Sequence, residues 1–357
     1  MERPPVTPQT ADGTQPPTAP TRYRWILVTL ATGVAGGALA QLLGLPSGWL
    51  LGPLFLVLAG VIGGLPLQMP SATAPLIGLL LGISIASSIN HRLLEQLPHW
   101  GISLALMLLM LACLMSILYL YYRRRCLWRR EDALLSAIPG NLAIIMMFAL
   151  ESGLRAERIA FVHSVRLIFL VSCLPLIFPL QPVATTGLEA NIPSLTLLVT
   201  LVAAFLCGRL AAKLRAPAPM LVGGLLATLL ARFGLGWEVS IPPLLFTFIL
   251  LLLGTSLGAR LAGIDLKAMI PVLGNALVGL VVTLCITTLF ALLLSTLLGV
   301  PLLQALLAYA PGGIEVMIAI ALSLDVDATF VAGHQITRML LMSALLPLML
   351  AWAQRYR

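Results

Sequence analysis

The stretch Ala310–Leu348 reads APGGIEVMIAIALSLDVDATFVAGHQITRMLLMSALLPL, and it has a counterpart 172 residues earlier in the chain. The counterpart, Ile138–Leu176, reads IPGNLAIIMMFALESGLRAERIAFVHSVRLIFLVSCLPL. Aligned without a gap from their prolines onward, the two stretches share 10 identities in 38 positions, and these include Pro, Gly and Arg. A repeat of this kind predicts an internal duplication, with these two stretches as its most distinctive parts.

Composition places the chain in a membrane. Hydrophobic residues make up 60% of it and charged residues 10%, and its mean hydropathy is +1.04. Apolar runs of about 20 residues recur from Trp25 to Trp352, which predicts an all-α polytopic membrane protein and excludes a water-soluble domain. The net charge of +8 lies in short loops and chain ends, where it favours cytoplasmic anchoring over binding of nucleic acid.

Three segments follow from the composition and the repeat. Residues 1–21 hold six prolines and five threonines and are predicted to be a disordered, retained N-terminal tail. Residues 22–182 are predicted to be a first membrane repeat and 183–357 a second, with six hydrophobic segments visible in each.

Two arrangements of the repeats are open, and the basic residues discriminate between them. If all twelve segments cross, the repeats lie parallel and eight basic residues face outward. If the Pro139 and Pro311 segments are broken or re-entrant, each repeat has about five spans and the second repeat is inverted. Only Arg92 and Arg232 then face outward, Arg166 and Arg338 lie in the membrane, and the other 17 of the 21 basic residues face the cytoplasm. The positive-inside rule favours inversion, with both termini cytoplasmic in a bacterial inner membrane.

Both Pro-Gly sequences are candidate binding sites, Pro139–Gly140–Asn141 in the first repeat and Pro311–Gly312–Gly313 in the second. A break in a membrane helix leaves backbone N–H groups without partners, and an anion, a carboxylate or water would satisfy them. The alternative is a kink packed against neighbouring helices.

Glu315 is the one carboxylate well inside an apolar segment, and the first repeat has Ala143 at its position. Such an acid is costly in a membrane and usually faces a cavity or a partner, which makes Glu315 a candidate proton or cation site. The alternative is that the segment is short enough for Glu315 to reach water.

Each break is followed by a helix that carries polar residues. His334 and Arg338 are four residues apart, His163 and Arg166 are three apart, and the repeat alignment pairs His163 with Gln335. These residues are candidates for an anion clamp or a proton relay, whereas snorkelling arginines are the alternative. Ser84 and Ser256, each following a Gly-x step, are weaker candidates because such residues often serve close packing.

The paired P-G-(G/N) segments, the following H/Q-bearing helices and the early PSGWLLGP (Pro46–Pro53) resemble the membrane-bound AbrB family with its AbrB duplication domains. The resemblance covers about residues 25–352, and the first repeat departs from it with Asn141 where the second has Gly313. Members are labelled AbrB family transcriptional regulator or ammonia monooxygenase. The family is also loosely similar to the cation–proton antiporter and anion transporter superfamily, which implies inverted repeats and broken helices.

These observations predict a secondary transporter of a small solute, with anions among the candidate classes. The alternatives are a membrane-embedded regulator of gene expression and, with less support, a membrane monooxygenase. The expected partners are the lipid bilayer, the solute, a proton or cation and a second copy of the chain, without nucleic acid. Five single cysteines and four scattered histidines give no metal-ligand pattern, so no catalytic residue, metal or cofactor is expected.

Overall fold

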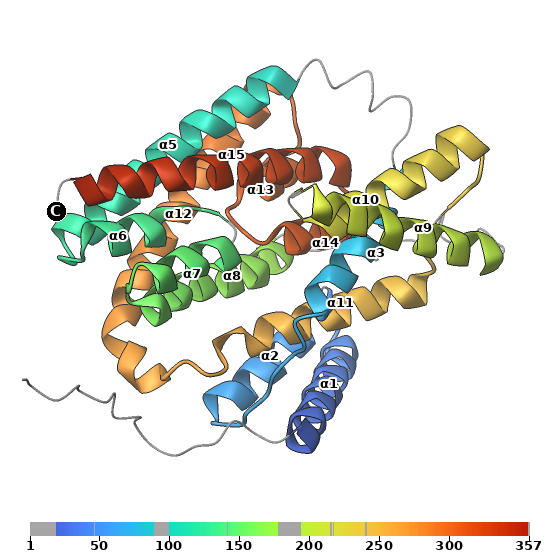
Figure 1. The fold of residues 1–357 in the computed structure, drawn as a ribbon, viewed down its shortest axis with the longest axis horizontal. Coiled ribbons are helices and arrows are strands. Elements are labelled where there is room, and N and C mark those ends of the chain that lie inside the picture. The colour runs from blue at the N-terminus through green and yellow to red at the C-terminus, as the bar shows by residue number, and fades with distance from the viewer. Residues whose placement is uncertain are drawn as a thin grey trace, which may run out of the picture.

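The computed structural model describes residues 19–45, 47–88, 100–140, 142–177, 194–214, 216, 218–239 and 241–355, and every element in these ranges is a helix (Figure 1). Most of the predicted tail therefore lies outside the described residues. The first half contains α1 (Ala19–Leu42), α2 (Gly48–Ile62), α3 (Thr73–Ser88), α5 (Trp100–Arg124), α6 (Arg130–Ala137), α7 (Leu142–Glu151) and α8 (Ala156–Ile177). The second contains α9 (Ser194–Lys213), α10 (Pro219–Leu229) with the π-helix η2 (Leu230–Gly234), α11 (Pro243–Gly258) with the 3-10 helix η3 (Ala259–Leu261), α12 (Leu266–Leu298), α13 (Leu302–Tyr309), α14 (Ile314–Ser323) and α15 (Ala328–Arg355).

Seven of the described helices are long and apolar enough to cross a membrane, namely α1, α5, α8, α9, α11, α12 and α15. Several others are apolar but shorter, including α2, α3 and α14. The chain is thus a multi-pass membrane protein, because helices of this length and composition have their backbone groups satisfied internally and can face lipid.

Glycines bring the helices of each half into close contact. Gly36 on α1 meets Gly52 on α2, and a Cβ at Gly52 would collide with the carbonyl oxygen of Gly36. Gly208 on α9 meets Gly223 on α10 in the same way. Small residues at these crossings let the backbones approach, which is how helices pack when lipid removes the hydrophobic drive between them.

The two halves also interlock. Helix α2 packs on α11, where Gly254 lies against the carbonyl of Leu50, and α10 packs on α3, where Gly82 lies against the carbonyl of Leu221. These two crossings join elements of opposite halves. Helices α5 and α15 lie side by side through ring contacts of Trp100 with Phe330 and of Tyr119 with Trp352, and α14 lies near the middle of Figure 1.

At each Pro-Gly sequence the structure has a break between two short helices. Helices α6 and α7 flank Pro139, and α13 and α14 flank Pro311. The residues before the prolines, Ile138 and Ala310, have ψ angles of 122° and 128°, because the proline ring excludes the helical conformation from the preceding residue. The breaks were predicted from the sequence, whereas α6 and α13 were not recognised as separate helices.

Helix α12 begins at Leu266, five residues before a proline, because Asp265 accepts hydrogen bonds from the N–H groups of Lys267 (3.0 Å) and Ala268 (3.2 Å) and caps the helix. Helix α12 then continues through Pro271 to Leu298.

Candidate functional site

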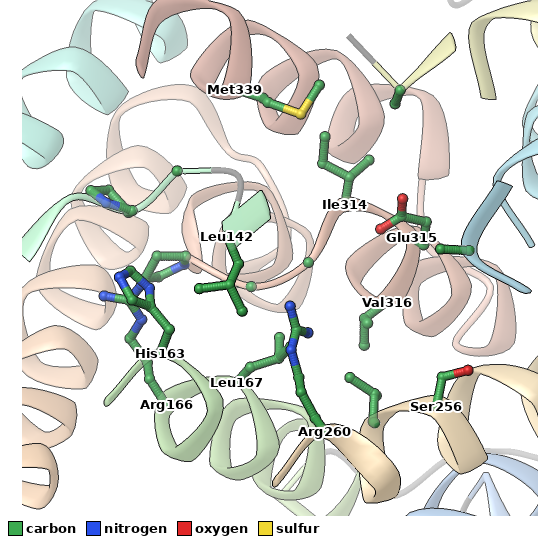
Figure 2. Close-up of a pocket in the computed structure, with 18 of the residues that line it drawn as sticks. Leu142, His163, Arg166, Leu167, Ser256, Arg260, Ile314, Glu315, Val316 and Met339 are labelled. Atoms are coloured by element: carbon green, nitrogen blue, oxygen red, sulfur yellow. The ribbon is translucent and has the colours of Figure 1, made fainter. Parts of the chain in front are cut away.

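Both breaks line one cavity of about 630 Å³ (Figure 2). Its wall is contributed by the two breaks, by α8 and α15 behind them, by α3, and by the end of α11 with η3. Ten of the predicted site residues line it: Pro139, Gly140, His163, Arg166, Ser256, Pro311, Gly312, Gly313, Glu315 and Arg338. Segments that lie 172 residues apart in sequence therefore meet at one site.

On the side of the first break, His163 and Arg166 form a chain of hydrogen bonds. Arg166 Nη2 donates to His163 Nδ1 (2.8 Å), and His163 Nε2 lies 2.9 Å from the carbonyl oxygen of Leu135 on α6. A guanidinium can only donate, so Nδ1 must carry the lone pair and Nε2 the proton. This geometry requires a neutral His163.

The second break repeats this arrangement with a different residue. Gln335 Nε2 donates to the carbonyl of Leu307 on α13 (2.7 Å), and Arg338 Nη2 donates to Gln335 Oε1 (2.6 Å). Each residue stands 172 positions after its counterpart in the first half. A neutral histidine offers one N–H donor and one acceptor, and glutamine offers an NH2 group and an acceptor at similar reach, so either can join the arginine to the short helix before the break.

Arg338 makes two further hydrogen bonds. Its Nη1 donates to the carbonyl oxygen of Ala310 (2.6 Å) and its Nη2 to that of Gly312 (3.0 Å). Arg338, only 4% exposed as a residue, therefore binds through its guanidinium the two carbonyls on either side of Pro311. The Ala310 carbonyl also accepts hydrogen bonds from the backbone N–H of Gly312 (2.8 Å) and from Gln335 Nε2 (3.1 Å), so Arg338 is one of three donors to it.

A charged residue that sequence reasoning missed also lines the cavity. Arg260 lies in η3, at the end of α11, and Figure 2 shows its side chain extending from the lower part of the view towards the centre, with the Glu315 carboxylate to the right. Arg260 and Glu315 interact electrostatically. Within the described ranges the Arg260 guanidinium has no hydrogen-bond partner and forms no ion pair.

The remaining predicted residues lie elsewhere. His334 does not line the cavity; its Nδ1 lies 2.8 Å from the carbonyl of Phe330 and its Nε2 lies 2.8 Å from Ser103 Oγ on α5. Gln335 lies behind the second break, Ser84 lies outside the lining, and Asn141 lies outside the described residues. His334 and Arg338 therefore point to different neighbours, although they are four apart on one helix.

The electrostatic character of the cavity follows from its charged residues. Arg166, Arg260 and Arg338 face a single carboxylate, Glu315, so the formal charges sum to +2. Helix α14 adds its N-terminus, where Gly313 provides no side-chain cap for the first N–H groups. The arrangement can attract and hold an anion. Over the part of the chain that is described, no three His, Cys, Asp or Glu residues are grouped so as to hold a metal ion.

Comparison with known proteins places this architecture in a family. The family model described as transition state regulatory protein AbrB matches residues 56–354. The chain is 27% identical over 359 residues to YhjN of Bacillus subtilis, an uncharacterized protein, covering 89% of this chain and 90% of that one. It is 25% identical over 307 residues to an Escherichia coli K12 protein whose name proposes it as a regulator, AbrB, covering 83% of this chain and 86% of that one. No solved structure matches. Because the family model covers most of the chain, including both breaks and all three arginines of the cavity, this protein belongs to the membrane-bound AbrB family.

Proposed function

We propose that this protein is a secondary transporter of a small anionic solute in the bacterial inner membrane, with the cavity between the two breaks as its binding site. The observation that carries the proposal is the convergence of both breaks and three arginines on one cavity. Charged groups inside a membrane protein are costly and usually mark a pathway or a ligand site. Arg166 and Arg338 are buried and Arg260 is half-buried, and these three arginines beside one acid leave an excess of positive charge for which an anion is the natural complement.

The architecture supports this proposal when it is taken as two inverted repeats of about five spans, each with a re-entrant broken segment and with both termini cytoplasmic. The distribution of basic residues favours inversion. The matched contacts of His163 and Gln335 with their short helices support a duplicated unit. In transporters built from inverted repeats the solute site lies at the interface of the repeats, formed by discontinuous helices.

Within this proposal Glu315 is the coupling residue that binds a proton or a cation. Carbonyls at a helix break often coordinate cations in transporters. Here the carbonyls of Ala310 and Gly312 accept from the guanidinium of Arg338, and Glu315 is the carboxylate in the cavity lining that can bind a coupling ion.

Uptake into proteoliposomes tests the proposal across many solutes at once. Liposomes containing the purified protein are exposed to a pool of small anions, cations and neutral solutes under an imposed proton or sodium gradient, and the retained solutes are identified by mass spectrometry. We expect retention of anions by the parent protein and loss of that retention in Arg260→Gln. Lys267→Gln, which removes an exposed positive charge outside the cavity, is the matched control. Retention confined to neutral or cationic solutes, or equal to that of protein-free liposomes, would contradict the proposal.

The name of the Escherichia coli relative favours a second candidate function, a membrane-embedded regulator of gene expression that acts through a partner protein. A second copy of the chain is a further candidate partner. If the protein is a regulator that does not transport, the Arg260→Gln variant should restore the transcript profile of a deletion strain as well as the parent protein does. If the protein is a transporter whose solute affects expression, the parent protein should restore the transcript profile and Arg260→Gln should not.

A further inference from the structure

We propose that Arg260 is the residue that contacts the anion, and that Glu315 is its counter-charge until the anion binds, so that each bound anion brings one proton onto Glu315. The inference rests on the proposed function and deepens it, because it names the solute-contacting residue and the stoichiometry of coupling. Neither role follows from the repeat, since the first half has Ser88 at the position equivalent to Arg260 and Ala143 at the position equivalent to Glu315.

The hydrogen bonds of the three arginines distinguish their roles. Arg338 donates to three protein acceptors and Arg166 to one, the nitrogen of His163. Both are fixed to the scaffold around the breaks. Arg260 has no such partner in the ranges that the structure describes, and it lines the cavity from the end of α11. Its planar, doubly donating group therefore has all its donors available for an incoming carboxylate.

The groups that face Glu315 determine what happens to its charge. Helix α14 packs against α3 and α11, which contain no titratable residue, and against α13, which contributes Tyr309. It also packs against α8, with His163 and Arg166, and against α15, with His334 and Arg338. Both histidines are held by protein groups, and Arg338 is bound to Gln335 and the break carbonyls. Arg260, on η3 at the end of α11, also lines the cavity, has no hydrogen bond or ion pair within the described residues, and interacts electrostatically with Glu315.

Anion binding changes this balance. An anion on Arg260 offsets the positive charge that favours an ionised Glu315 and adds a negative charge near it. An ionised carboxylate left without a counter-charge in a low-dielectric site takes up a proton instead. The proton comes from solvent and adds to a carboxylate oxygen of Glu315, so one negative charge enters with one proton. No bond other than this O–H forms or breaks.

The lining indicates the class of anion. One free guanidinium matches a single carboxylate, and the rest of the wall is largely apolar, with Leu142, Met146, Leu253 and Met339 among its residues. Such a wall favours an organic anion with an apolar body over a hydrated inorganic oxyanion. We therefore take small monocarboxylates as the solute class.

Thermal unfolding of the purified full-length protein tests the assignment with four probes. These are sodium butyrate, sodium benzoate, sodium sulfate and the neutral amide butyramide, each compared with sodium chloride at equal ionic strength. At about 50 mM, we expect butyrate or benzoate to raise the melting temperature by about 2–4 °C, and butyramide and sulfate to have no effect. Stabilisation by sulfate alone would overturn the carboxylate class, and no shift with any probe would overturn the site.

The pH dependence tests the linkage. Carboxylates with ordinary pKa values of about 4 to 5 remain ionised between pH 6 and pH 8. If binding takes up one proton, the affinity for butyrate or benzoate falls by up to about tenfold per pH unit over the range in which Glu315 is ionised. In Glu315→Gln the amide stands in for the protonated acid, so binding persists and becomes independent of pH. Equal pH dependence in the parent and in Glu315→Gln would overturn the role of Glu315.

Calorimetric titration of the same probes in two buffers of different ionisation enthalpy counts the protons. We expect close to one proton per carboxylate for the parent and close to none for Glu315→Gln. Arg260→Gln should lose binding and Lys267→Gln should keep it. If Arg260→Gln does not fold, Arg260→Lys replaces it, and weakened binding is then expected because lysine lacks the planar fork. Binding that survives loss of Arg260 overturns the assignment, whereas absence of uptake in proteoliposomes with these binding results intact overturns transport alone.

Discussion

The two breaks of this protein share a scaffold and differ in charge. In each, a Pro-Gly sequence separates two short helices, and an arginine 27 residues after the proline is joined through one side chain to the helix before the break. At the second break, Arg338 also binds the carbonyls of Ala310 and Gly312, and Glu315 stands in the first turn of the following helix. The first break has Ala143 at that position.

The two breaks show how similar segments can differ in charge and keep the same hydrogen-bond pattern. The contact that positions the arginine is retained even where its residue changes from His163 to Gln335, because the backbone carbonyl it satisfies is still buried. The acid is present in only one copy. We infer that the first break is mainly a wall of the cavity and that the second carries the coupling chemistry.

The largest expected effect is on the labelling of loops that report the orientation of the two halves, because each loop is either accessible or inaccessible in intact cells. If the halves are inverted, the loops at 151–158 and 208–216 both face the cytoplasm. In a cysteine-free background, Glu157→Cys and Lys213→Cys should resist an impermeant thiol reagent in intact cells and react after permeabilisation. Reaction of either cysteine in intact cells would favour parallel repeats with twelve spans and would place the two breaks on the same side.

Loss of the arginines should destabilise the second break more than the first. Arg338→Gln removes three hydrogen bonds from buried acceptors, and we expect it to lower the free energy of unfolding by about 2–4 kcal/mol. Arg166→Gln removes one hydrogen bond, and we expect it to lower the free energy of unfolding by about 1–2 kcal/mol. The loss for Arg338→Lys should lie between these two values. Denaturant titration in mixed micelles measures these values. Equal losses at the two arginines would contradict the asymmetry of the breaks.

The glycines of the breaks should also differ. A Cβ at Gly312 would overlap the terminal methyl of Met317, and we expect Gly312→Ala to cost about 1 kcal/mol, with recovery when Met317→Ala is added. At Gly140 the nearest atom is Ile138 Cγ2 at 3.4 Å, so Gly140→Ala should be close to neutral. The bulkier Gly312→Leu should reduce solute uptake more than the yield of folded protein. Matched losses of uptake and yield would support a packing role only.

The smallest effect is expected for an exchange of residues between the halves. His163→Gln and Gln335→His each keep a donor for the carbonyl of the short helix and an acceptor for the arginine, so we expect less than about 1 kcal/mol of destabilisation. His163→Leu, which leaves the carbonyl of Leu135 and a guanidinium N–H unsatisfied, should cost about 1–3 kcal/mol. Unfolding of the exchanged variants at the level of His163→Leu would show that the two contacts are not equivalent.

The repeat explains why much of the site was predictable. Gly and Pro at matching positions indicate backbone breaks, and charged residues inside apolar segments indicate a cavity, so Pro139, Pro311, Arg166, Arg338 and Glu315 were recognised from sequence and line one cavity. Their approach across the two halves depends on close helix crossings, which sequence spacing within one repeat does not reveal.

The residues that were missed or misplaced have physical reasons. Arg260 has no charged counterpart in the first half and stands at the end of an apolar helix, where an arginine is usually interfacial. His334 shares α15 with Arg338, but α15 has neighbours on several sides, and spacing alone does not decide which one a side chain meets. Helix α6 is only eight residues long and begins with charged residues, so it has no apolar periodicity to detect.

Cysteines at the two breaks test whether both breaks face one cavity of positive potential. The structure leaves room for a Cβ at Gly140 and at Gly313, and the five native cysteines are all free and can be replaced. The reaction rates of Gly140→Cys and Gly313→Cys are measured in detergent with a sulfonate and a trimethylammonium methanethiosulfonate, relative to Lys213→Cys as an external reference. We predict that the anionic reagent is favoured by about tenfold at both positions, which corresponds to about 1.4 kcal/mol of electrostatic attraction. A preference for the cationic reagent, or a response at one position while the other behaves like the reference, would show that the two breaks do not share a cavity of positive potential.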